Sequence, residues 1–405
     1  MGNSFRQTVA GIFAHPEMNQ QIMLSGHIQA TMERAEATVG EYAIAAQDTT
    51  YYNYSGHKKM SGLGVIQGNV RGLMQHNVLL LNEQGLPLGL LGQQYWTRDG
   101  GLDLREGEKE SSKWLKGLNA INQQASQSSK RFVTVEDREG DVFSFFKAER
   151  KTNVDLLVRV YQARNLEIVS SNIVCQLPDV SSHLPDYGTQ RVRIYRQNRE
   201  VELILRLRAG AVNVYPDKNL SAKRHKTQGL SLVVAQELGC IDPKTNEDIF
   251  CSEDAATWYL LTSLPITTTS NVQRVTRFYA LRWRIERFHY TLKSGALQVE
   301  KLQFDDIQTL INSLAFYSVV AWQILALTYA IRENPDQSAS IVFDESEVIL
   351  LEKVSSKKII SISDAVLALA KIVGFAPTKK QPYPGVKVLA TAIERFFFIK
   401  LGSTA

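Results

Sequence analysis

Three acidic residues occupy positions where a carboxylate could do chemistry. Asp48 follows the first buried-strand pattern of the chain, Asp137 follows the fourth, and Glu286 lies in a long helical pattern. Phosphoryl transfer on nucleic acid needs little covalent help from protein and typically uses two metal ions about 4 Å apart. Mg²⁺ prefers carboxylate ligands, so acids from separate elements can suffice. For each acid alone, a solvated strand end or turn remains the alternative interpretation.

The surroundings of Glu286 favour a phosphate-binding site. Tyr279, Arg282, Glu286 and Lys293 follow one another at offsets of 0, 3, 7 and 14 residues. At about 100° per residue they fall near 0°, −60°, −20° and −40° on one narrow stripe of a helix. Arg and Lys side chains suit phosphate oxygens. A solvated charged face is the alternative.

Other kinds of site find less support. The sequence has no histidine or cysteine cluster for zinc and no P-loop, and GLGVIQG is too loose for a dinucleotide fingerprint. Cys175, Cys240 and Cys251 form no C-x-x-C pair, which excludes a disulfide scaffold and indicates a reducing compartment. The first twenty residues lack a signal-peptide pattern. We therefore expect a cytoplasmic protein of bacterial type.

An α/β core is predicted around the first two acids. Residues 1–40 have helical spacing, and from Tyr42 the segment YAIAAQDTT predicts a short buried strand that ends in an acid. Further strands are predicted at RGLMQHNVLLLN, LPLGLLGQQYWTR, RFVTVEDREGD and DLLVRVYQA, and helices at ESSKWLKGLNAINQQ and DVFSFFKAER. This order predicts a mixed sheet with flanking helices.

The second half of the chain has a different pattern. From about Asn165 to Glu253, alternating segments such as RVRIYRQ and VELILRLRA predict a β-rich insertion. The segment NVQRVTRFYALRWRIERFHYTLKSG predicts one long helix, with Ser270 and Gln273 at capping-box spacing and Gly295 as its end. The remainder is mostly helical.

Positive charge is concentrated in two segments. Residues 186–230 carry ten Lys and Arg against four acids, a net +6, while the whole chain has a net charge of +5. Residues 271–301 add seven basic residues against Glu286 and Glu300. Such concentrations are typical of proteins that bind a phosphate backbone. Dispersed counter-charges on a solvated face are the alternative.

The overall composition is that of a globular protein. The 405 residues are 44% hydrophobic and 21% charged, which excludes wholesale disorder and fibrous repeats and suggests two to four domains. The nearest approach to a membrane span is 314–331, which Ser318, Gln323 and Thr328 interrupt. We expect it to be a buried helix, with no membrane partner.

The motifs resemble those of one family. Tyr279, Arg282, Glu286 and Lys293, with the spacing Y-x2-R-x3-E-x6-K, are similar to the Y-R-E-K signature of DDE transposases of the insertion-sequence-4 family. The likeness is greatest to the transposon-five (insertion-sequence-50) branch. AAQDTT and VEDREGD resemble the family's first and second aspartate motifs, and WYLLTSLP resembles the segment before the third. The likeness runs from about residue 14 to the C-terminus, where PYPGVKVL also fits.

The resemblance implies an RNase H-like core that a β-rich insertion interrupts. It makes Asp48, Asp137 and Glu286 the metal-binding triad, with two Mg²⁺ ions for which Mn²⁺ can substitute. It further implies DNA-binding roles. Trp258 would stack on a flipped-out base, and four further residues would bind phosphates: Tyr279, Arg282, Lys293 and Arg159. The implied regions are 1–41, a remnant of an N-terminal DNA-binding region; 42–164 and 256–330, the core; 165–255, the insertion; and 331–405, a helical dimerisation region.

The implied activity is cut-and-paste transposition of a bacterial insertion sequence by strand nicking, hairpin formation and strand transfer. The partners would be transposon-end DNA, target DNA and a second copy of the chain, at the nucleoid. Only the last part of the family's N-terminal DNA-binding domain is expected before Tyr42. Two alternatives therefore stay open: a truncated regulator that dimerises without binding ends, and a domesticated RNase H-like nuclease.

Overall fold

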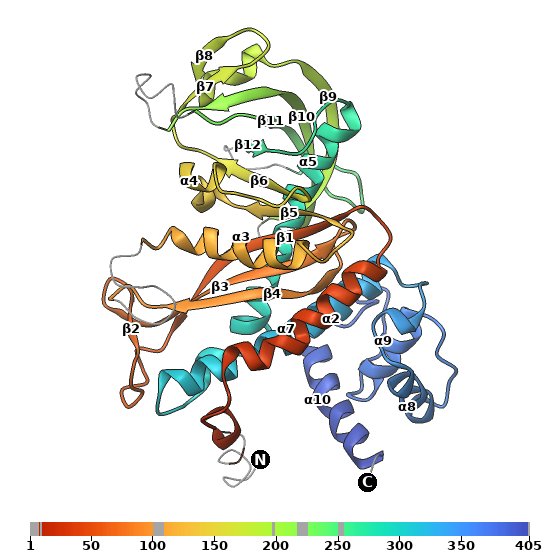
Figure 1. Cartoon of the computed structure of the whole chain (residues 1–405). Helices are drawn as coiled ribbons and strands as arrows, with labels where there is room; N and C mark the ends of the chain where they lie inside the picture. The colour runs from red at the N-terminus through yellow and green to blue at the C-terminus, as the bar shows by residue number, and fades with distance from the viewer. Residues whose placement is uncertain are drawn as a thin grey trace.

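The computed structural model describes residues 8, 10–99, 109–196, 199–216, 226–249 and 255–403. Twelve strands of this part form one sheet in the order β2-β3-β1-β5-β6-β12-β11-β10-β7-β8, with β4 beside β3 and β9 beside β10 (Figure 1). The strands are β1 (Tyr42–Asn53), β2 (Gly64–Gln67), β3 (Val70–Asn82), β4 (Pro87–Trp96), β5 (Arg131–Glu136), β6 (Val154–Val160), β7 (Asn165–Ile168), β8 (Ile173–Gln176), β9 (Asp186–Arg196), β10 (Arg199–Val214), β11 (Leu230–Ile241) and β12 (Thr257–Thr262).

The first half of this sheet has RNase H-like topology. β4, β3 and β1 are antiparallel neighbours, and β1, β5 and β6 pair in parallel, which gives the order β4-β3-β1-β5-β6. The predicted α/β class with a mixed sheet is therefore confirmed. β2 is a short strand that the sequence analysis did not predict. The division of the chain into functional regions stays a prediction.

Helices cover both faces of the core strands. α3 (Ser112–Ala125) and α4 (Phe143–Phe146) pack on one face, and α5 (Thr269–Leu281), α6 (Trp283–Tyr290) and α7 (Ile307–Glu333) pack on the other. β1 contributes to both cores because its side chains alternate: Ile44 and Ala46 face α5–α7, while Ala43 and Ala45 face α3. Burial on both faces explains why this strand is a continuous apolar run.

Strands β7–β11 extend the same sheet at one end of the molecule (Figure 1). β12 pairs with both β6 and β11 and so joins the core strands to this extension. The basic residues Lys218, Lys223 and Arg224 and the thiol Cys251, which the sequence analysis singled out, lie outside the described residues.

The helix that carries Glu286 is not continuous. α5 ends at Leu281 and α6 begins at Trp283, because the N–H of Arg282 bonds the carbonyl of Tyr279, three residues back. After Tyr290 the backbone widens into one π-helical turn that ends at Gly295. The expectation of one regular helix is therefore wrong at two places, although its end at Gly295 is correct.

The N-terminal cap of α5 also differs from the expectation. The hydroxyl of Thr268 accepts the N–H of Asn271, and the Asn271 side chain accepts the N–H of Thr268, both at 3.2 Å. The capping box is therefore two residues earlier than Ser270 and Gln273. Asn at the third helical position closes the same reciprocal pair that Gln was expected to close.

The C-terminal region is helical and lies at the end opposite β7 and β8 (Figure 1). α8 (Glu345–Ser355), α9 (Ile362–Lys371) and α10 (Val386–Ser403) enclose a third core with the end of α7. α7 is long and apolar enough to span a membrane by length and composition, and 61% of its most apolar window is buried within the fold. It packs on β4, α2 (Gln20–Ala37) and α10, as expected for a core helix.

A glycine of α3 tests how tightly this helix packs on β1, and a glycine of α2 serves as its control. A methyl group on Gly117 of α3 would lie 1.9 Å from Oε1 of the buried Gln47, whereas one on Gly26 of α2 would meet nothing within 4 Å. Gly26→Ala should raise the free energy of unfolding by about 1 kcal/mol, because alanine favours helix. Gly117→Ala should lower it by about 1–3 kcal/mol through overpacking. Denaturant unfolding measures both; a gain in stability for Gly117→Ala would contradict this packing.

Candidate active site

The first two acids lie at the same edge of the sheet. β1 pairs in parallel with β5 up to Ala46, which stands opposite Val135. Asp48 and Asp137 each come two residues later, so the register brings the two carboxylates level with each other. Since side chains alternate along a strand, Asp48 projects from the face that Ala46 shares with α6. The predicted neighbourhood of these two acids is therefore present.

The sequence analysis placed Asp48 after the first strand, but in the structure Asp48 lies inside β1. β5 ends at Glu136, but β1 continues along its antiparallel partner β3 as far as Asn53, and Asp48 stands opposite Asn77. Asp137 does follow its strand: its carboxylate accepts the N–H of Glu139 at 2.8 Å and caps a short 3₁₀ turn.

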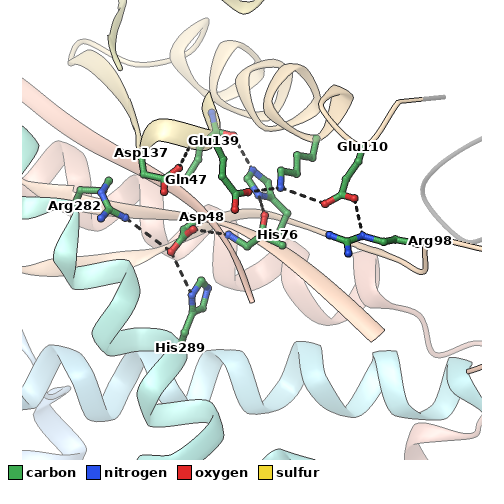
Figure 2. Close-up of polar contacts among 11 residues, drawn as sticks. Gln47, Asp48, His76, Arg98, Glu110, Asp137, Glu139, Arg282 and His289 are labelled. Carbon is green, nitrogen blue, oxygen red and sulfur yellow. Dashed lines mark hydrogen bonds and ion pairs between the residues drawn. The ribbon is translucent and has the colours of Figure 1, made fainter. Parts of the chain in front are cut away.

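A chain of ion pairs ties that turn to α3. Nζ of the buried Lys113 lies 3.0 Å from Oε2 of Glu139 and 3.7 Å from Oε1 of Glu110. Glu110 in turn lies 3.1 Å from Nε of Arg98 (Figure 2). The backbone that carries Asp137 is thus held against the helix that packs behind β1.

The third acid is linked to the first by Arg282. Its guanidinium Nη2 donates to Oε1 of Glu286 at 2.9 Å, and Nη1 lies 3.9 Å from Oδ2 of Asp48. Figure 2 shows Arg282 and His289 approaching Asp48 from different sides, with Asp137 nearby. The Arg282 side chain is only 7% exposed. A buried cation therefore stands among the predicted acids.

The pKa values of these groups reflect their crowding. The pKa of Asp48 is raised to about 7. Burial is the largest cause, Arg282 acts in the opposite direction, and Asp137 and Glu286 also raise it. Burial by itself lowers the pKa of Arg282, but Tyr279 and the acids Asp48, Glu286 and Asp137 more than offset this and hold it above its ordinary value. The three acids are therefore close enough to repel one another, and Arg282 is the cation that compensates them.

His289 is a fourth member of the group, and the sequence analysis missed it. Its Nδ1 lies 3.7 Å from Oδ2 of Asp48, and its Nε2 lies 3.0 Å from the amide nitrogen of Asn77. Burial lowers the pKa of His289 to about 3, with further lowering by Lys293 and Arg282, so the ring is neutral at physiological pH. Its position three residues after Glu286, on the same side of α6, was the available signal.

A pocket of about 460 Å³ opens beside this group. Five of the predicted site residues line it: Arg159, Trp258, Tyr279, Arg282 and Glu286. The rings of Trp258 and Tyr279 meet edge to face with centroids 5.1 Å apart, and both side chains are almost fully buried. Arg159 reaches the pocket from β6, next to the strand β12 that carries Trp258.

The pocket has further cationic and aromatic walls that the sequence analysis did not select. The guanidinium of Arg287 lies 4.4 Å from the ring centre of Tyr290 and 5.1 Å from that of Tyr195. Arg287 and Tyr290 follow Glu286 in sequence, but Tyr195 comes from β9. Only the folding of the β-rich segment over α6 brings that ring to the site.

Lys293 is separated from the pocket. Its Nζ donates to the backbone carbonyl of Tyr51 at 2.5 Å and lies 3.8 Å from Oε1 of Glu300. Lys293 is about 10 Å beyond Glu286 along the helix axis. It also lies in the π-helical turn, which begins at Thr291 and changes the angular step assumed for the stripe. Tyr279, Arg282 and Glu286 line the pocket, whereas Lys293 bonds the backbone near the end of β1.

Most basic side chains of the β9–β10 hairpin have acidic partners. Arg191 and Arg193 lie 3.6 and 3.8 Å from Glu202, and Arg206 lies 2.5 Å from Asp186. Glu202 and Asp186 are among the four acids already counted, so only partners from outside the segment, such as Glu167 beside Lys226, lower the net charge of its described part further. Arg196, which lines the pocket, makes two hydrogen bonds of 2.8 and 2.9 Å to Glu237; Glu237 also accepts the N–H of Ala256.

The donor set suits a hard divalent cation. Asp48, Asp137 and Glu286 offer carboxylate oxygens from three separate elements, the ligands that Mg²⁺ prefers. As they stand, no three His, Cys, Asp or Glu side chains of the described residues are close enough together to hold an ion. The hydrogen bond from Arg282 to Glu286 is one contact that competes with such a site. The chemistry of the residues fits Mg²⁺, and Glu286 would have to release Arg282 to complete the site.

No protein-family model matches the chain. Among solved structures, the chain is similar to a piggyBac transposase synaptic complex with hairpin DNA, with a TM-score of 0.37 and 11% sequence identity. The match covers 98% of this chain and 65% of that chain.

Removing the cation among the acids should destabilise the fold. Arg282→Met leaves Asp48 and Glu286 without their partner and should lower the free energy of unfolding by about 3–5 kcal/mol. Arg277→Met, an exposed position on α5, should change it by less than about 0.5 kcal/mol. Adding Glu286→Gln to Arg282→Met should recover part of the loss. Equal stability of the two single variants in urea would contradict the role of Arg282.

Asp48 should reduce stability at high pH. Folding raises the pKa of this acid from 3.8 to about 7. The protein therefore loses stability as pH rises through that interval, and it regains none at higher pH. The difference corresponds to at most about 4 kcal/mol, and 19% exposure of the side chain lowers it. Metal-free Asp48→Asn should therefore be more stable than wild type by about 2 kcal/mol at pH 8, with little gain at pH 4. A pH-independent difference would be inconsistent with this shift.

Proposed function

We propose that the chain is a DNA transposase of the insertion-sequence-4 type, which cuts and joins DNA strands by metal-dependent phosphoryl transfer. One observation carries the proposal. The parallel register of β1 and β5 brings Asp48 level with Asp137, and Arg282 bonds Glu286 while lying 3.9 Å from Asp48. Acids that are far apart in sequence thus lie near an arginine, a side chain suited to binding phosphate. Strand transfer at phosphorus needs such a group of acids to hold metal ions.

The acids are proposed to hold two Mg²⁺ ions, with Mn²⁺ as a substitute. When bound, these ions would help an oxygen attack phosphorus and stabilise the oxygen that leaves. Asp48 is central in this proposal because the other two carboxylates both act on its pKa. Arg282, once Glu286 turns away from it, would be free to bind a phosphate oxygen at the same place.

The pocket is proposed to hold DNA next to the cleaved phosphate. Arg159 and Arg287 supply positive charge, and Trp258, Tyr290 and Tyr195 supply ring faces or edges along its wall. Arginine beside aromatic rings suits unpaired nucleotides, since bases stack on rings while guanidinium groups bind phosphate. The proposed reaction on transposon ends is nicking, hairpin formation, hairpin opening and transfer to target DNA in a bacterial cytoplasm.

A homodimer is proposed for the DNA complex, with α10 as its contact. This C-terminal helix leaves Phe397, Phe398 and Leu401 exposed by 56%, 47% and 52%. Adjacent large apolar side chains on one helix are costly in water and are typical of a protein–protein contact. Pairing two copies would also bring together two transposon ends.

The cleavage test uses DNA duplexes copied from the two boundaries of the genomic element that encodes the chain, with the purified protein and Mg²⁺. The wild type should nick these ends and join pre-cleaved ends to target DNA. Glu286→Gln should lose cleavage by at least about a thousandfold, as expected for loss of transition-state charge stabilisation, while DNA affinity changes little.

Glu345→Gln serves as the matched control, because Glu345 is exposed at the start of α8 and remote from the acids. It should cleave like the wild type. No Mg²⁺-dependent nicking or joining by the wild type, or full activity of Glu286→Gln, would refute the proposed function.

A further inference from the structure

A buried hydrogen-bond chain runs from α7 to the candidate active site. It begins at Ser318, whose hydroxyl donates to the backbone carbonyl of Leu314 at 2.7 Å. A carbonyl only accepts, so this bond fixes the hydroxyl hydrogen and leaves the oxygen to accept from another group. Nε2 of Gln75 fills that place at 3.3 Å. The direction of the chain is therefore set at a backbone atom.

The same constraint decides which atom donates and which accepts in each following side chain. Nε2 of Gln75 also donates to the hydroxyl of Tyr95 at 2.7 Å, while its Oε1 accepts from Tyr52 at 2.5 Å. The Tyr95 hydroxyl must then donate onward, and it meets Oε1 of Gln93 at 3.1 Å. The amide of Gln93 turns its nitrogen to Oδ1 of Asn77 at 2.8 Å. Reversal of any of these side chains would set two donors or two acceptors against each other.

The last hydrogen bond of the chain determines which ring nitrogen of His289 carries the hydrogen. With Oδ1 engaged by Gln93, Asn77 presents its amide nitrogen to Nε2 of His289 at 3.0 Å. Nε2 must accept, so in the neutral ring the hydrogen is on Nδ1. Nδ1 is the atom that faces Asp48, at 3.7 Å from Oδ2. The chain from Ser318 onward is almost wholly buried, so water does not compete for these bonds.

We propose that His289 is a positioning residue for Asp48, held by this chain as the tautomer with hydrogen on Nδ1. An N–H facing the carboxylate attracts Oδ2, while the N–H of Thr49 holds Oδ1 at 2.8 Å. A lone pair of the ring in the same place would repel Oδ2 instead. A neutral ring also adds no further positive charge beside Arg282. Only the role of Asp48 in metal binding rests on the proposed function; the tautomer does not.

The tautomer is tested in the metal-free full-length protein by ¹⁵N NMR of labelled histidine, with the signals of His289 identified by their loss in His289→Asn. The wild type should show hydrogen on Nδ1 and none on Nε2. Gln93→Glu gives position 93 two acceptor oxygens, so Asn77 should turn over, present Oδ1 to the ring, and move the hydrogen to Nε2. This variant changes no atom that touches His289.

Gln94→Glu is the matched control, because it adds the same charge one residue away on a side chain that bonds the carbonyl of Lys113 and is not part of the chain. It should leave the His289 signals unchanged. Hydrogen on Nε2 in the wild type, or no change in a folded Gln93→Glu, would overturn the inference. If Gln93→Glu does not fold, the wild-type spectrum still decides.

A second comparison tests the link to Asp48. His289→Asn places an amide nitrogen at the δ position and should retain cleavage to within about threefold, while His289→Gln places it at the ε position and should lose about 10- to 100-fold, as other partners of metal ligands do. A volume effect alone would favour Gln, the larger residue. The opposite order would overturn the positioning role. Absence of cleavage in the wild type would refute the proposed function and leave the NMR result standing.

Discussion

The candidate site depends on the repulsion among three carboxylates and on the one cation that compensates it. Asp48, Asp137 and Glu286 are brought together by elements whose packing is decided elsewhere, by apolar residues on both sides of β1. Without Arg282, the acids would oppose the very packing that assembles them. The arginine therefore stabilises the fold and, under the proposed function, stands where a metal ion or a phosphate would bind. A site of this kind accepts a cost in stability at the place where chemistry is proposed.

Much of the fold could be predicted because local pattern and packing agree. The apolar run before Asp48 gave a strand buried on both faces, and the acid after the fourth strand pattern fell at the edge expected for parallel neighbours. The errors have physical reasons. The spacing around Tyr279 is regular in sequence, but a tightened turn at Arg282 and a π turn after Tyr290 break the helix on which that spacing was projected. Lys293 lies within that π turn.

The site was less predictable than the fold because half of its walls come from pairing between distant segments. Asn77 stands beside Asp48 only through the antiparallel register of β1 and β3, and Tyr195 reaches the pocket only through the β9–β10 hairpin. Neither residue belongs to a motif. The charge count of the β-rich segment was incomplete for a similar reason, because it leaves out partners from outside the segment such as Glu237, which bonds Arg196.

The central claim is that three acids from separate elements form one metal site once Glu286 leaves Arg282. The most direct measurement is anomalous diffraction at the manganese edge from crystals of the protein grown with Mn²⁺. The account predicts manganese bound by Asp48 together with Asp137 and Glu286, with Glu286 no longer bonded to Arg282. Manganese bound at other residues only, with the Arg282–Glu286 hydrogen bond unchanged at saturating Mn²⁺, would contradict it.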